Sequence, residues 1–272
     1  MTKCVVVLSG GQDSTTCLFN SIRKFGKDNV YAVTFDYGQR HAIELESAAI
    51  VAKLAGVAER HETIVLPKGL LHSTSPLVSD NELEQYADAN SLPGGIEKTF
   101  VPMRNQFFLT LAANRCASVG AEALVTGVSG EDYGGYPDCR MNFIGAFQIA
   151  CNTGTFTGEE GAPKKLRVEV PLMFLTKKET VEMAVNLGPE CYRALSYSHT
   201  AYDGKYPPTG KDHASLLRAR GFEEALVSDP LVLRAYLDGT LERLPDTPNY
   251  TNSCVEEGLH LIDKAGGFNY GL

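Results

Sequence analysis

Residues 9 to 14, Ser-Gly-Gly-Gln-Asp-Ser, bring two glycines, two hydroxyls and a carboxylate together directly after the apolar run "VVVL". Glycines allow a tight turn in which backbone N–H groups and the start of a helix face an anion. A strand-to-helix turn without a ligand would also explain a Gly-Gly pair. However, Asp13 and Ser14 add a carboxylate and a hydroxyl where a Walker A loop has Gly-Lys-Ser/Thr. This combination favours a binding loop for phosphate groups.

Four further polar stretches follow or precede apolar runs in a regular order. They are "TFDYGQRH" from residue 34, "TFVPMRN" from residue 99, "GVSGEDYGGYPDCR" from residue 127 and "EVPLMFLTKKET" from residue 169. In open α/β sheets, ligands bind at the carboxyl ends of the strands. We therefore expect these stretches to lie near residues 9 to 14.

The elements that position these stretches alternate between strand and helix. Strands are expected near residues 3–8, 29–35, 59–67, 123–128 and 166–170, and helices near 12–25, 41–56, 104–119 and 142–150. This order predicts an α/β fold with a doubly wound, Rossmann-like parallel sheet of five strands. We expect a nucleotide-binding domain over residues 1–190 and a smaller helical C-terminal region over residues 191–272.

Composition narrows the class of protein. The chain has 272 residues, is 43% hydrophobic and carries a formal net charge of −8, which argues against a general surface for nucleic acids. No apolar run approaches the length of a membrane helix, and the first strand begins too early to follow a signal peptide. Seven scattered cysteines without a C-x-x-C pair indicate reduced thiols. We expect a cytoplasmic protein.

Together, "SGGQDSTTC" and the four later stretches resemble the 7-cyano-7-deazaguanine synthase family, called QueC, in order and spacing. The resemblance covers roughly residues 3 to 221, and "GYPDCR" is its most discriminating part. QueC enzymes belong to the ATP pyrophosphatases (PP-loop enzymes), which adenylate a carbonyl or carboxylate oxygen. The resemblance implies that ATP and ammonia convert 7-carboxy-7-deazaguanine into a nitrile through adenylated carboxylate and amide intermediates. It also favours a homodimer, whereas charge and hydropathy predict neither nucleic acid nor membrane as a direct partner.

The resemblance also implies site residues. ATP would be bound by Leu8, Ser9, Gly10, Gly11, Gln12, Asp13, Ser14, Phe35 and Asp36, with Mg²⁺ arriving on the ATP. The substrate would be bound by Arg104, Asn105, Tyr136 and a carboxylate from Glu131, Asp132 or Asp138. The catalytic residues would be Asp13, Arg104 and Lys177. A surface charge at a helix start is the alternative for Arg104 and for Lys177, and Cys139 is expected to pack in the pocket wall.

The sequence departs from the family at its zinc site. QueC proteins usually bind one zinc through four cysteines, and the corresponding residues of this chain are Ala201, Thr209, Asp212 and Ser215. We therefore expect no zinc. Another interaction must hold this loop, for example the restricted Pro207 and Pro208 or contacts from the long tail after Ser228.

A second departure leaves the product open. Met103 stands where the family normally has glycine, and a side chain directed into the pocket would hinder the second adenylation. The enzyme would then stop at the amide, or pass the activated acyl group to another amine such as a peptide or protein. A third alternative is a catalytically silent nucleotide-binding or partner-binding protein.

Overall fold

The computed structural model describes residues 2–38, 43–77, 85, 96, 98–130, 136–201 and 204–268. Most of the segment between Ser73 and Lys98 lies outside these residues. Within the described residues, the five predicted strands form one parallel sheet in the order β3-β2-β1-β4-β5. The strands are β1 (Cys4–Val7), β2 (Val30–Asp36), β3 (His61–Val65), β4 (Ala123–Val125) and β5 (Arg167–Glu169). The predicted doubly wound fold is therefore confirmed.

The described chain contains the four predicted helices, which begin within two residues of the expected positions, and further helices from Lys177 onward. They are α1 (Gln12–Phe25), α2 (Ile43–Leu54), α3 (Arg104–Val119), α4 (Met141–Gly154), α5 (Lys177–Asn186), α6 (Pro189–Leu195), α7 (His213–Glu224), α8 (Pro230–Leu237) and α9 (Asn252–Lys264). Short 3-10 helices are η1 (Lys27–Asn29), η2 (Ala58–Arg60), η4 (Pro137–Cys139) and η5 (Pro248–Tyr250). The helix expected near 142–150 extends to Gly154, and the strand expected near 166–170 is shorter.

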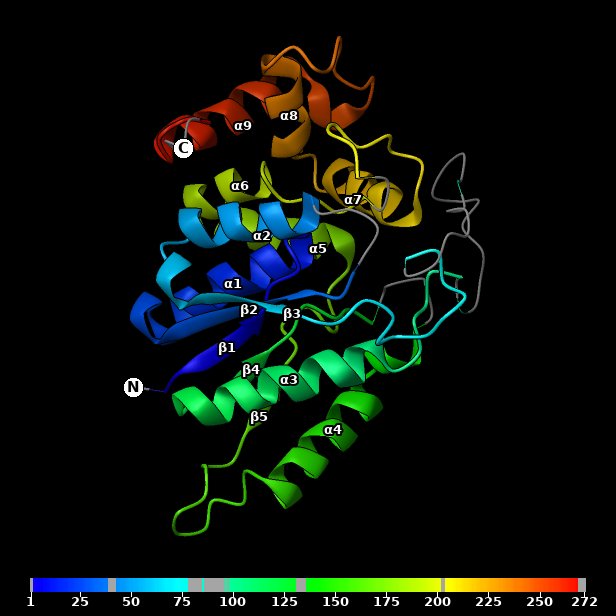
Figure 1. Ribbon diagram of the computed structural model, residues 1–272. Coiled ribbons are helices and arrows are strands. Elements are labelled where there is room, and N and C mark those ends of the chain that lie inside the picture. Colours follow the sequence, from blue (N-terminus) through cyan, green and yellow to red (C-terminus); the bar gives the residue numbers. More distant parts are fainter. Residues whose placement is uncertain are drawn as a thin grey trace.

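The sheet separates two apolar cores because side chains alternate between its faces. In β1, Val6 packs into the core under α1, α2, α5 and α6, whereas Val5 packs into the core under α3 and α4. Figure 1 shows these two helix layers on opposite faces of the sheet. Both faces of the central strands β1 and β4 are covered, which explains why these two strands are continuous apolar runs rather than alternating ones.

The C-terminal helices cover the outer side of α6. In Figure 1, α8 and α9 lie beyond α6, on the side away from the sheet. Their packing is close: a Cβ on Gly258 of α9 would lie 2.7 Å from the hydroxyl oxygen of the fully buried Tyr192 in α6. The expected boundary after residue 190 falls inside α6, and the division into two domains stays a prediction.

No helix among the described residues combines the length and the apolar composition that crossing a membrane requires.

Candidate active site

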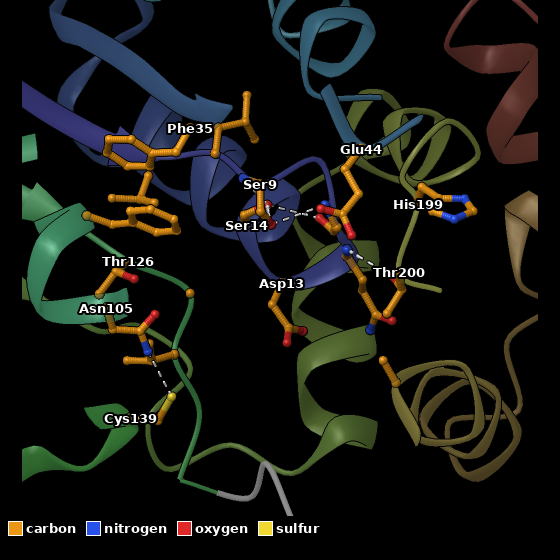
Figure 2. A pocket seen from close by; sticks show the side chains of 18 of the residues that line it. Ser9, Asp13, Ser14, Phe35, Glu44, Asn105, Thr126, Cys139, His199 and Thr200 are labelled. Carbon is orange, nitrogen blue, oxygen red and sulfur yellow. Dashed lines mark hydrogen bonds between the residues drawn. The ribbon is translucent and has the colours of Figure 1, made fainter. Parts of the chain in front are cut away.

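A cavity of about 330 Å³ opens where the strand order reverses, at the carboxyl ends of β1 and β4. This switch point is where ligands bind in doubly wound sheets. Figure 2 shows Phe35 toward one end of the cavity and Thr200 toward the other. The predicted site residues that line it are Leu8, Ser9, Gly11, Gln12, Asp13, Ser14, Phe35, Arg104, Asn105, Tyr136 and Lys177.

The turn after β1 depends on Gly10. Its φ is +84°, and a Cβ there would lie 2.4 Å from the Glu44 carbonyl oxygen and 2.8 Å from the Ala48 backbone nitrogen. A glycine is required because both the backbone conformation and the space exclude a side chain. Gly10 itself does not line the cavity; it presses the loop against α2 and so sets the position of its neighbours.

The two serine hydroxyls hold the loop closed at its base. The Ser9 hydroxyl lies 3.0 Å from the Ser14 hydroxyl, which also accepts from the Ser9 backbone N–H at 3.2 Å. Ser14 Oγ donates to the Gly11 carbonyl at 3.2 Å. Ser14 is buried and Ser9 is exposed, so Ser14 shapes the loop and Ser9 presents its hydroxyl to the cavity.

The start of α1 provides a positive electrostatic environment. Its N-cap, Gly11, has no side chain that could cap the first N–H groups at the cavity end of the helix, and the Gln12 N–H instead lies 3.5 Å from the Thr200 hydroxyl. Gln12 is 3% exposed and lines the cavity, and its side-chain nitrogen Nε2 has no hydrogen-bond partner among the described residues. A buried donor without a partner is costly, and an anion at this helix start would satisfy it.

Asp13 and Lys177 form an ion pair at the cavity wall. Lys177 Nζ donates to Asp13 Oδ2 at 2.8 Å, and the two side chains are 14% and 25% exposed. Lys177 is the first residue of α5, where Thr176 and Glu179 form a capping box. A Cβ on Gly221 of α7 would lie 2.9 Å from Lys177 Cβ, so α7 packs directly against this residue. Lys177 is therefore not a solvated helix-start lysine.

The predicted adenine side is partly apolar. The Phe35 ring stacks on Phe108 with ring centres 4.4 Å apart, and it is almost fully buried. The Leu8 side chain is packed in the core, so that only its backbone can reach a ligand. Asp36 does not line the cavity, and its carboxylate accepts from the Gly38 N–H at 3.1 Å.

Arg104 lies among groups that the sequence interpretation had not connected. It hydrogen-bonds to the Tyr37 hydroxyl and lies near the Glu44 carboxyl, and all three residues line the cavity. Burial raises the pKa of Glu44 to about 7, although the charge of Arg104 lowers it. Figure 2 shows Glu44 reaching from α2 toward the loop of Ser9 and Ser14. The signal for these residues was the stretch "DYGQRHAIELE", which carries Tyr37 and Glu44 immediately after β2.

The predicted substrate side is held by η4 and the start of α3. Asn105 Nδ2 donates to the Asp138 carbonyl at 3.4 Å and lies 3.3 Å from Cys139 Sγ, and Cys139 lines the cavity. Asp138 is buried and does not line the cavity; burial raises the pKa of its carboxyl, and Arg104 acts in the opposite direction. Tyr136 lines the cavity and hydrogen-bonds to Thr99. Glu131 and Asp132 lie outside the described residues.

Met103 does not narrow the cavity, contrary to the concern raised by the sequence. It is the N-cap of α3, with φ +64° in the left-handed region, and it is 65% exposed. The cavity lining does not include it. The family's glycine at this position is explained by the backbone conformation rather than by space in the pocket.

The four positions of the family's zinc cysteines do not fit a metal ion. Ala201 is buried without a donor atom, and Asp212 is the N-cap of α7. Both Asp212 oxygens accept from Ser215: the backbone N–H at 3.1 Å and the hydroxyl at 2.6 Å. Among the described residues, no group of three or more His, Cys, Asp or Glu side chains could hold a metal. That the protein carries no zinc stays a prediction.

Known proteins are similar in sequence to most of this chain. The sequence model of the family described as "Queuosine biosynthesis protein QueC" matches residues 3–226. A 7-cyano-7-deazaguanine synthase of Gloeobacter violaceus is 50% identical over 232 residues, which are 85% of this chain and 96% of that protein. One from Chromobacterium violaceum is 45% identical over 240 residues, covering 85% of this chain and 94% of that protein. Residues 227–272 lie beyond the family match.

Proposed function

Because this chain belongs to the QueC family, we propose that it converts 7-carboxy-7-deazaguanine, ammonia and ATP into 7-cyano-7-deazaguanine. The observation that carries the proposal is the loop of residues 9–14 at the switch point of the sheet, with the Asp13–Lys177 pair beside it. The relatives named 7-cyano-7-deazaguanine synthase support the choice of substrate and product.

The first step activates the carboxylate. A carboxylate oxygen attacks the α-phosphorus of ATP, the bond to the bridging oxygen breaks, and pyrophosphate leaves while AMP stays on the acyl group. Pyrophosphate would be held by the Ser9 hydroxyl, the first N–H groups of α1 and the Lys177 ammonium. Fixed donors aimed at developing charge are an effective source of catalysis. Mg²⁺ bound to the ATP oxygens would offset part of the phosphate charge.

Ammonia then attacks the activated carbon, and AMP leaves to give the amide. A second ATP adenylates the amide oxygen, and loss of AMP together with the protons on nitrogen gives the nitrile. Each substrate oxygen thus leaves on one AMP, so the balance is two ATP converted to two AMP and two pyrophosphates for each nitrile.

The protons released from nitrogen need an acceptor in the cavity. We assign this role to Glu44, which lines the cavity and whose raised pKa of about 7 suits a general base near neutral pH. Arg104 would bind the substrate carboxylate as a planar fork, and its position beside Glu44 would keep the two groups coupled. Tyr136 and Asn105 would line the substrate side, with Asp138 behind them.

The direct test is the product formed from ATP, ammonium and 7-carboxy-7-deazaguanine, identified by mass spectrometry together with the AMP count. We expect the nitrile and two AMP for each product. A product heavier by one water with one AMP, or an acyl group on an added peptide amine, would replace the nitrile by one of the alternatives. The absence of substrate-stimulated ATP consumption would support a silent binding protein. A homodimer and a cytoplasmic location belong to the same proposal, and sedimentation of the purified protein tests the first of them.

A further inference from the structure

Residues beyond the family match take part in the polar core beside the active site. The match ends at residue 226, yet Ser228 and Asp229 are buried and lead into α8. The side chains of Leu231 and Leu233 on α8 are also buried. The C-terminal extension, residues 227–268, is therefore an integral part of the fold.

Asp229 forms a bidentate ion pair with Arg218 of α7. Arg218 Nε and Nη2 donate to the two Asp229 oxygens at 2.6 and 2.8 Å, and the two side chains are 4% and 5% exposed. Asp229 also caps α8 by accepting from the Leu231 N–H at 2.9 Å. A paired guanidinium can be buried at this depth because its charge and its donors are satisfied together.

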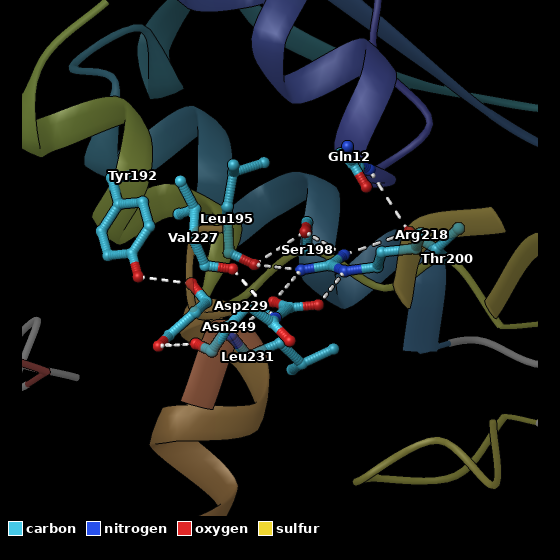
Figure 3. Close-up of polar contacts among 11 residues, drawn as sticks. Gln12, Tyr192, Leu195, Ser198, Thr200, Arg218, Val227, Asp229, Leu231 and Asn249 are labelled. Atoms are coloured by element: carbon cyan, nitrogen blue, oxygen red, sulfur yellow. Dashed lines mark hydrogen bonds and ion pairs between the residues drawn. The ribbon is translucent and has the colours of Figure 1, made fainter. Parts of the chain in front are cut away.

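The remaining donors of Arg218 hold the segment from Leu195 to Thr200. Nη2 donates to the Leu195 carbonyl at 3.1 Å, and Nη1 donates to the Ser198 hydroxyl at 2.8 Å and to the Thr200 hydroxyl at 3.1 Å. Figure 3 shows Arg218 at the centre of these contacts, between Asp229 and Thr200.

The same segment bonds to the nucleotide loop through its backbone. The His199 N–H donates to the Gly10 carbonyl at 2.8 Å, and the Gln12 N–H points to the Thr200 hydroxyl at 3.5 Å. A continuous chain of hydrogen bonds thus runs from Asp229 through Arg218 and Thr200 to the first residue of α1. Figure 3 shows the link from Thr200 to Gln12.

The loop in which the family's zinc cysteines are missing lies between two residues of this network in the sequence. The positions Ala201, Thr209, Asp212 and Ser215 all fall between Thr200 and Arg218 in the sequence. The extension holds this loop a second time: Tyr206 donates to Asp238 at 2.6 Å, and the Arg234 guanidinium lies 4.3 Å from the ring centres of both Tyr197 and Tyr206. The expectation that the tail contacts this loop is confirmed.

We propose that Asp229 is a positioning residue for ATP: through Arg218 and Thr200 it fixes the nucleotide loop, in a chain whose loop lacks the family's zinc donors. This inference rests on the proposed function, because it takes residues 9–14 as the phosphate-binding loop. Its consequence is specific. Loosening the network disturbs the binding of ATP more than the binding of the deazaguanine.

The test is a double-mutant cycle in the full-length protein between Asp229→Asn and Thr200→Val. Asparagine keeps an N-cap for α8 and removes the charge paired with Arg218, and valine removes the hydroxyl that links Arg218 to Gln12. We expect each variant to raise KM for ATP about tenfold, the loss of roughly one charged hydrogen bond. KM for 7-carboxy-7-deazaguanine should change less than about twofold on the same scale. The double variant should be no worse than the worse single variant.

The matched control is Ser228→Ala, which removes a buried hydrogen bond from Ser228 Oγ to the Asn249 carbonyl but no contact of Arg218. It should lower the melting temperature and leave KM for ATP unchanged. The inference would be overturned if the two single increases in KM for ATP multiply in the double variant. It would also be overturned if the variants change KM for ATP and KM for 7-carboxy-7-deazaguanine equally. If Asp229→Asn does not fold, Arg218→Lys replaces it in the cycle with the same expectation.

Failure of the inference is distinguishable from failure of the proposed function. Ser9→Ala and Asp13→Ala are measured in the same assay. If they keep full pyrophosphate release, the loop is not the phosphate site and the inference fails with it. If Ser9→Ala and Asp13→Ala lose pyrophosphate release but the effects of Asp229→Asn and Thr200→Val on KM for ATP are independent, only the role of Asp229 is wrong.

Discussion

The smallest unit on which the chemistry depends is the pair of Asp13 and Lys177 beside the Ser9 hydroxyl. Replacing Asp13 by alanine removes the partner that orients the ammonium, and replacing Ser9 removes a donor to the leaving pyrophosphate. We expect each substitution to lower substrate-dependent pyrophosphate release by about 10²–10³-fold. The exposed Asp28→Ala serves as control and should behave like the wild type. Circular dichroism should show an intact fold, and full turnover in both site variants would refute the assignment.

Also at the residue scale, the raised pKa of Glu44 makes the stability of the protein depend on pH. Its pKa is about 7 in the folded protein and near its ordinary 4.5 when unfolded, so the folded state binds this proton more tightly. The contribution to stability is complete below the unfolded pKa and is lost as the pH rises through about 7. As the pH rises from about 5 to about 8, the melting temperature of the wild type should therefore decrease relative to that of Glu44→Gln.

The activity of the same variant tests the proposed base. In the wild type, kcat/KM should rise with ionisation of Glu44 near pH 7. Glu44→Gln should lower kcat/KM and lose this acidic limb, because glutamine accepts no proton. Glu46→Gln, an exposed change two residues along α2, should retain both the rate and the limb. An unchanged acidic limb in Glu44→Gln would exclude Glu44 as the base.

At the scale of elements, the start of α3 carries a strained residue. Met103 adopts φ +64° at the N-cap, a conformation that costs a side-chain-bearing residue about 1 kcal/mol and costs glycine little. Met103→Gly should therefore raise the free energy of unfolding by about 1 kcal/mol in a denaturant titration. Met103→Ala keeps the backbone strain and should not raise the free energy of unfolding. Because Met103 faces solvent, neither change should alter the product, and an accumulation of amide in either variant would contradict the observed orientation.

At the scale of the whole molecule, the C-terminal extension packs against the loop of residues 204–215 through Tyr206. We expect less than one zinc per chain by elemental analysis of protein purified without chelator, because Asp212 is committed to Ser215 and Ala201 has no donor. Adding a chelator should leave the melting temperature unchanged. One tightly held zinc for each chain would show that the assignment of these four positions is wrong.

The fold was predictable because its signals are local. Strand-like segments with helical periods between them predicted the order of strands and helices, and the start of α1 at Gln12 and of α3 at Arg104 followed from their turns. The glycine turn after β1 predicted the nucleotide loop for the same reason, since a positive φ at Gly10 is a property of that residue and its neighbours.

The partners of the site were decided by the tertiary structure, and the physical reason is separation in the chain. Lys177 meets Asp13 across 164 residues, and Thr200 meets Gln12 across 188 residues. The burial that raises the pKa of Glu44 depends on everything packed around it, which no local pattern encodes. The sequence alone determined which chemical groups stand at the strand ends. Only packing determined which charges pair, which side chains face solvent and which tail residue is connected to the nucleotide loop through Arg218 and Thr200.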